Sequence, residues 1–165
     1  MTAATLDSKE IIYNHIRKEA TINFFLNLII NAVIAWFALG KNSPLTLWGE
    51  HSFGPDLITT AVILGWLLGG IFIFTHRMKV RKGQLPALDL DIPRWLPRNS
   101  LLAGLCFCVA TLVCFLPITF ATFYALDIST LTIEAYCVFK GVWAGVIAML
   151  VVPLAILVGL STESK

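Results

Sequence analysis

A polar residue recurs at every fourth position in Glu19-Ala-Thr-Ile-Asn23-Phe-Phe-Leu-Asn27-Leu-Ile-Ile-Asn31. The surrounding segment, residues 20–39, is otherwise almost entirely apolar. A run of about 20 such residues is long enough to cross a bilayer as an α-helix. Carboxamides within a bilayer are costly unless another helix or a water-filled cleft receives them. The stretch therefore predicts a membrane-spanning helix whose polar seam, formed by Glu19, Asn23, Asn27 and Asn31, faces the inside of a bundle.

The composition of the whole chain supports a membrane protein. Of its 165 residues, 58% are hydrophobic and 13% are charged, whereas soluble domains have about 45–50% and about 25%. The apolar residues form four blocks, so we expect one all-α domain over residues 1–165, an integral membrane four-helix transmembrane bundle. The net charge of +2 is too small to indicate a nucleic-acid partner. The predicted helices are 8–39, 56–76, 99–126 and 131–160.

Local signals set these boundaries. Asp7, followed by Glu10 three residues later, predicts a helix start. Pro55 suits a first helical position and Asp56 a first turn. Asn99 or Ser100 is the candidate cap for the third helix. The first apolar run is longer than the core of a signal peptide and lacks a small-residue cleavage site, so we expect it to stay in the mature protein.

The basic residues indicate an orientation. Short outer loops are expected at 40–55 and 127–130, and segment 76–99 is a basic, proline-interrupted loop expected to lie against lipid headgroups. Ten of the twelve Lys and Arg residues lie in the amino-terminal part, in this loop or in the carboxyl tail. The positive-inside rule then places both termini and this loop in the cytoplasm. We expect the inner membrane of a bacterium, with membrane lipid as a partner.

The polar seam has three interpretations. Glu19 is expected at the cytoplasmic boundary, with Asn31 about 18 Å deeper. The amides either hydrogen-bond across helices and fix the packing, line a site entered from the cytoplasm, or form a self-association surface. We expect Glu19 to meet a cation of its own depth: His76, Arg77 or Arg98.

Two further charges lie inside apolar blocks. Asp56 and Lys140 fall near the outer ends of the second and fourth helices, where pairing would neutralise both. Glu134 is the competing partner for Lys140. Extension of the lysine ammonium to the outer interface is favoured over a proton or ion relay.

Two pairs of glycines at four-residue spacing predict close helix packing. Gly65 and Gly69 lie in the second helix, and Gly141 and Gly145 in the fourth. Each pair creates a shallow groove that permits close backbone approach. The sequence leaves open whether the grooves are used within one chain or between copies.

No pattern of catalytic or ligand-binding residues is evident. The cysteines show no CxxC spacing and are read as small apolar residues. The three histidines are predicted at the two membrane surfaces, and we expect no metal and no cofactor. These cysteines and histidines are Cys106, Cys108, Cys114, Cys137, His15, His51 and His76.

Two functions from different classes remain. The first is a small permease-like or channel-like protein with a cytoplasm-facing polar site on the first helix. The second is a non-catalytic accessory or assembly subunit of a membrane complex. A membrane-embedded enzyme ranks third. Four helices enclose little volume, so transport would need a homo-oligomer or a larger complex.

Overall fold

The structure, a computed structural model, describes residues 3–41, 44–50, 52–90, 92–93 and 95–161, with side chains from Glu10 onward. Four described helical spans are long and apolar enough to cross a membrane. They confirm the predicted all-α bundle. The predicted interfacial position of His51 lies outside the described residues.

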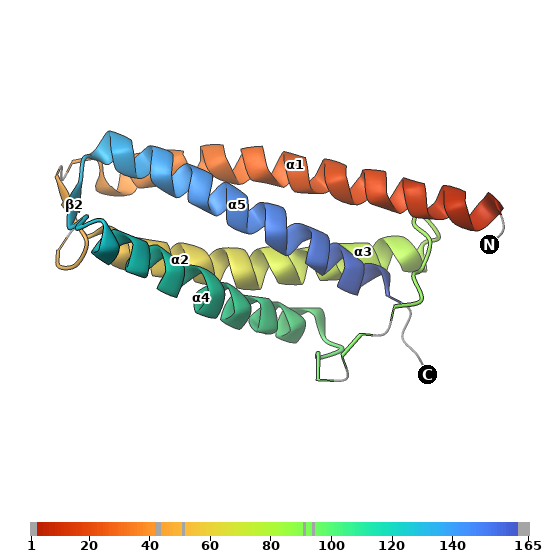
Figure 1. The fold of residues 1–165 in the computed structure, drawn as a ribbon. Helices are drawn as coiled ribbons and strands as arrows, with labels where there is room; N and C mark the ends of the chain where they lie inside the picture. The colour runs from red at the N-terminus through yellow and green to blue at the C-terminus, as the bar shows by residue number, and fades with distance from the viewer. Residues whose placement is uncertain (1–2, 42–43, 51, 91, 94, 162–165) are drawn as a thin grey trace.

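The chain forms long helices joined by short connections (Figure 1). The first span belongs to α1, and the second is one continuous helix made of α2, a π-helical segment η1, and α3. Single helices, α4 and α5, make the third and fourth spans. Two short strands, β1 and β2, pair antiparallel at one end of the bundle. The bounds are α1 Ala3–Leu39, β1 Leu45–Thr46, α2 Phe53–Ile63, η1 Leu64–Leu68, α3 Gly69–Arg81, α4 Ser100–Ala125, β2 Thr130–Leu131 and α5 Ile133–Leu160.

The boundaries differ from those predicted at three places. Helix α1 begins at Ala3 rather than near Asp7, because nothing in the alanine-rich start breaks a helix. The second span extends beyond 56–76 at both ends, with Pro55 inside its first turn. Of the two candidate caps, Asn99 is the one used, since its side chain accepts hydrogen bonds from the backbone N–H groups of Leu101 and Leu102.

Helix α5 is the centre of the bundle. It packs against α1 on one side and against α3 and η1 on another. Helix α4 packs against α2, η1 and α3 but has little contact with α5. Consequently α1 and α4 lie on opposite sides of the molecule (Figure 1). Most of their apolar side chains are exposed, as expected for surfaces that face lipid.

Both glycine grooves are used within one chain. A Cβ atom added at Gly141 would lie 2.7 Å from the Leu28 carbonyl oxygen, and one at Gly145 would lie 2.9 Å from that of Phe24. The α5 glycines therefore hold α1 at backbone contact. In the same way, a Cβ atom at Gly65 would lie 2.5 Å from the Cα atom of Cys108 on α4.

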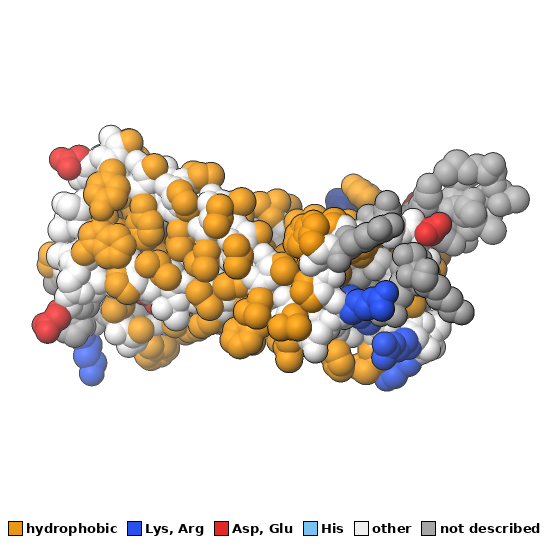
Figure 2. All heavy atoms as spheres, turned by 90° about the horizontal axis from the view of Figure 1, so that it is seen from below, with side chains coloured by type: hydrophobic (Ala, Val, Ile, Leu, Met, Phe, Trp, Pro, Cys, Tyr) orange, Lys and Arg blue, Asp and Glu red, His pale blue; other side chains and the backbone are white. Residues whose placement is uncertain are grey.

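The two ends of the bundle have different connections. Strands β1 and β2 tie the 40–52 and 126–132 connections together at one end. The termini and segment 82–99 lie at the other end (Figure 1). There the Leu88 N–H donates a 2.7 Å hydrogen bond to the Leu160 carbonyl oxygen, which fastens this segment to the end of α5. Figure 2 shows apolar side chains along the middle of one face and charged groups at its two ends.

We predict that Gly141→Ala lowers the free energy of unfolding by about 1–3 kcal/mol, because the added methyl group must push α1 away from α5. Equilibrium unfolding in mixed SDS–detergent micelles, followed by circular dichroism, measures the change. The matched control is Gly70→Ala on α3, where an added Cβ atom would lie 3.4 Å from its nearest neighbour. The control should leave the unfolding curve unchanged or slightly raise the free energy of unfolding. Equal curves for both variants would contradict the proposed role of this contact.

Candidate functional site

The three seam amides lie inside the protein. Asn23, Asn27 and Asn31 are 6%, 8% and 7% exposed, although α1 as a whole is a peripheral helix. They continue a buried stripe that includes Ala20 and Ala35. Because α1 packs mainly against α5, this stripe forms the α1–α5 interface.

The amides are hydrogen-bonded by their own helix, not by another one. The Nδ2 atom of Asn23 donates to the Glu19 carbonyl oxygen at 2.9 Å, that of Asn27 to Asn23 at 2.9 Å, and that of Asn31 to Asn27 at 3.0 Å. Of the three interpretations of the seam, the one with amide bonds across helices is not observed among the described residues. Short polar side chains in a helix can return to the carbonyl four residues earlier. That geometry gives each amide nitrogen one hydrogen bond within its own helix.

Glu19 lies at the end of the seam. Its carboxylate interacts electrostatically with His76, one of the three cations expected to meet it, and with His15. Arg77 donates to the Arg98 carbonyl oxygen and, at 3.3 Å, to the Ser100 hydroxyl.

A histidine pair joins α1 to α3 at this end. The Nε2 atoms of His15 and His76 are 3.0 Å apart, and His76 is only 1% exposed. The His76 Nδ1 lies 2.9 Å from the Phe72 carbonyl oxygen and so donates its proton there. In neutral His76 the Nε2 then accepts from the N–H of His15. The sequence placed both histidines at the same membrane surface, but their contact depends on the packing of α1 and α3.

At the opposite end, Asp56 on α2 joins Lys140 and Tyr136 on α5. The Lys140 Nζ lies 2.6 Å from the Asp56 Oδ2, and the Tyr136 hydroxyl donates to the same oxygen at 2.5 Å. Lys140 is 1% exposed, and Tyr136 is fully buried. The pairing of Asp56 with Lys140 is confirmed. Glu134 is exposed and does not compete.

The expected extension of the Lys140 ammonium to the interface is wrong. The side chain turns inward, because α2 presents a carboxylate at the same depth. Tyr136, one turn earlier on the same face of α5, was missed. Its i, i+4 spacing from Lys140 was the available signal. The three groups satisfy one another, as a buried charge requires.

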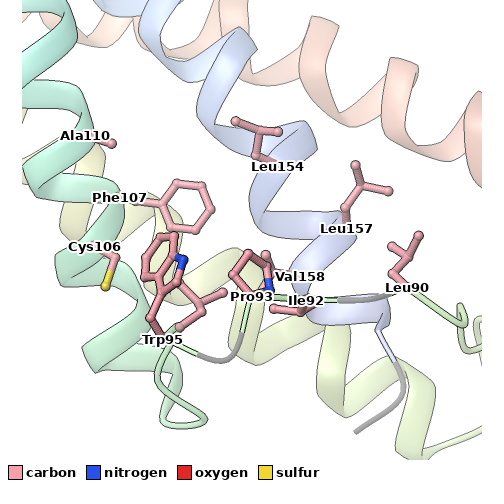
Figure 3. A pocket seen from close by; sticks show the side chains of 11 residues that line it. Leu90, Ile92, Pro93, Trp95, Cys106, Phe107, Ala110, Leu154, Leu157 and Val158 are labelled. Carbon is pink, nitrogen blue, oxygen red and sulfur yellow. The ribbon is translucent and has the colours of Figure 1, made fainter. Parts of the chain in front are cut away.

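An apolar cavity of about 380 Å³ lies between α4, α5 and residues 90–96 (Figure 3). Trp95, Phe107, Leu154 and Leu157 are among its lining residues. It exists because α4 and α5 have little direct contact. The described residues of its lining are all uncharged.

Among the described residues, no group of three or more His, Cys, Asp or Glu side chains lies close enough together to hold a metal ion. All four cysteines are free. Two of them, Cys108 and Cys137, are buried in helix contacts, whereas Cys114 is exposed on α4.

The helices and their buried charges define a small multi-pass integral membrane protein. No protein-family model matches the chain, and no match was found among curated proteins or solved structures.

We predict that Lys140→Met lowers the free energy of unfolding by about 3–5 kcal/mol, because it leaves the Asp56 carboxylate partly buried without its cation. Tyr136→Phe should cost about 1.5–3 kcal/mol, the contribution of a hydrogen bond to a charged group. Unfolding in SDS–detergent mixtures measures both.

The control for this pair of variants is Glu134→Gln, which removes a charge from the exposed first turn of the same helix. It should change stability by less than about 0.5 kcal/mol. The double variant Asp56→Asn/Lys140→Met should lose less free energy of unfolding than the sum of the losses in the two single variants. Strict additivity would show that the two groups do not interact.

Proposed function

We propose that this protein is a non-catalytic accessory or assembly subunit of a membrane complex, with the amide seam serving to hold its own helices together. The observation that carries the proposal is the closure of Asn23, Asn27 and Asn31 onto the backbone of α1. A substrate site requires polar groups that are available to a ligand. Here one proton of each amide group is already donated within the helix.

The packing beside the seam supports the same function. The interior positions of α5 are filled by small and branched apolar residues, and Ala144, Ala148, Val152 and Ala155 are fully buried. Among the described side chains, no buried nitrogen or oxygen lacks a hydrogen-bond partner.

The outer surface offers room for a partner protein. Helix α1 contacts the rest of the bundle along one face, and its other faces carry exposed aromatic residues. Phe25 is more than half exposed, and Phe37 is 81% exposed. A transmembrane helix of a larger complex, or a second copy of this chain, fits against such a surface.

A permease-like or channel-like protein is the second candidate. The observation in its favour is the Asp56–Lys140 pair, because ionisable groups within membrane spans often mark transport pathways. In this case the working unit would be a homo-oligomer, and the pathway would pass the outer end of α2 and α5 rather than the amide seam.

The proposal includes an orientation with both termini and segment 82–99 in the cytoplasm of a bacterial inner membrane. Support comes from the basic residues and from the location of these three segments at one end of the bundle. We predict that green fluorescent protein fused to the carboxyl terminus is fluorescent in bacteria, because it folds in the cytoplasm. Alkaline phosphatase at the same junction should be inactive. The reverse pattern would invert the orientation.

We predict that Asn27→Leu/Asn31→Leu destabilises the bundle by about 1–3 kcal/mol per site, since larger side chains overpack the α1–α5 interface. Unfolding in SDS–detergent mixtures and native gel electrophoresis of solubilised membranes measure stability and assembly. The control is Asn14→Leu, an exposed carboxamide on the same helix. If the double variant is as stable as the wild type and assembles normally, the amides are not structural, and a binding role is favoured.

A further inference from the structure

A basic groove lies between α3 and the start of α4, at the end of the bundle that carries the termini. Its volume is about 670 Å³, and three arginines line it: Arg77, Arg81 and Arg98. None of the described residues that line it is acidic. The groove is separate from the amide seam and from the Asp56–Lys140 pair, and it is not used by the proposed function.

The arginines differ in how they are held. Arg77 is half-buried and bonds the Arg98 carbonyl oxygen and the Ser100 hydroxyl, which fixes its guanidinium beside the start of α4. Arg81 and Arg98 are exposed, and no described carboxylate forms an ion pair with either. The first amide groups of α4 are capped by Asn99. Binding of an anion therefore depends on the guanidinium groups, which present several N–H donors to phosphate oxygens.

The rest of the groove is apolar and continuous with the membrane-facing surface. Ile71, Phe74 and Leu101 line it, and each is more than half exposed. Ile71 and Phe74 belong to the second membrane-spanning helix, and Leu101 lies in the first turn of the third. Figure 2 shows basic side chains grouped beside apolar ones at this end of the molecule. Basic groups directly above apolar side chains match a lipid with an anionic head and an acyl tail.

We propose that this groove is a binding site for an anionic phospholipid of the surrounding leaflet. Its phosphate lies between the guanidinium groups of Arg77, Arg81 and Arg98, and an acyl chain runs along Ile71 and Phe74. A free phosphate ion satisfies the arginines but leaves this apolar wall without an occupant. The charge and the apolar wall together therefore select a lipid.

The test uses the full-length protein, purified in detergent and stripped of lipid. Binding of phosphatidylglycerol and of phosphatidylcholine is titrated by native mass spectrometry, with inorganic phosphate and glycerophosphoglycerol as arms without acyl chains. We expect phosphatidylglycerol to bind at least tenfold more tightly than phosphatidylcholine. Neither inorganic phosphate nor glycerophosphoglycerol should displace phosphatidylglycerol at equal concentration.

The informative variant is Arg81→Gln/Arg98→Gln. One basic residue beside an anionic headgroup accounts for about a fivefold factor in affinity, so this variant should lose about twentyfold for phosphatidylglycerol and little for phosphatidylcholine. The control Arg17→Gln/Lys82→Gln removes two exposed charges that do not line the groove and should change affinity less than twofold. Circular dichroism confirms that both variants fold.

Three outcomes would overturn the proposal. Equal affinity for the two lipids would remove the anionic selectivity. An equal loss in both double variants would show that net charge, rather than the groove, attracts the lipid. Competition by inorganic phosphate as strong as that by the lipid would make this a simple anion site.

Discussion

The close approach of α1 to α5 is the contact on which the remaining structure depends. Gly141 and Gly145 have no side chain, so the carbonyl groups of Leu28 and Phe24 rest directly on α5. Lipid tails are as apolar as leucine, and helices in a membrane therefore associate through tight packing rather than through hydrophobic burial. This contact also places the buried face of α1, with its three amides, against the most buried helix of the bundle.

Polar groups in this protein are satisfied over short distances. The amides of α1 use carbonyl groups of the preceding turn. The charges of Asp56 and Lys140 neutralise each other, and Tyr136 donates to the same carboxylate oxygen. His76 is bound by Phe72 on its own helix and by His15 on α1. These local hydrogen bonds and ion pairs are needed because water is not available inside a membrane to complete a hydrogen bond. It also supports the proposal that the seam serves packing rather than a substrate site.

The two ends of the bundle are built for different surroundings. At one end, strands β1 and β2 pair with each other, and the Asp56–Lys140 ion pair joins the second span to the fourth. Few charged side chains are exposed there. At the other end, segment 82–99 is fastened to α5, and arginines surround the start of α4. A basic end suits the anionic surface of the cytoplasmic leaflet. The proposed orientation and the proposed lipid site both rest on this distribution of charge, although each is tested by a separate experiment.

The sequence alone determined the number of membrane spans, the all-α class and the start of the third helix near Asn99 or Ser100, because hydropathy and capping depend on residues adjacent in the chain. It also placed Asp56 and Lys140 at a common depth, since depth follows from counting residues along each helix. Only the tertiary structure decided which helices touch. Several contacts depend on how each helix is rotated about its own axis. They are the inward turn of Lys140, the hydrogen bond of Tyr136 to Asp56, the His15–His76 contact and the pairing of each glycine groove. That rotation is set by close contacts between residues far apart in the sequence, which no local pattern encodes.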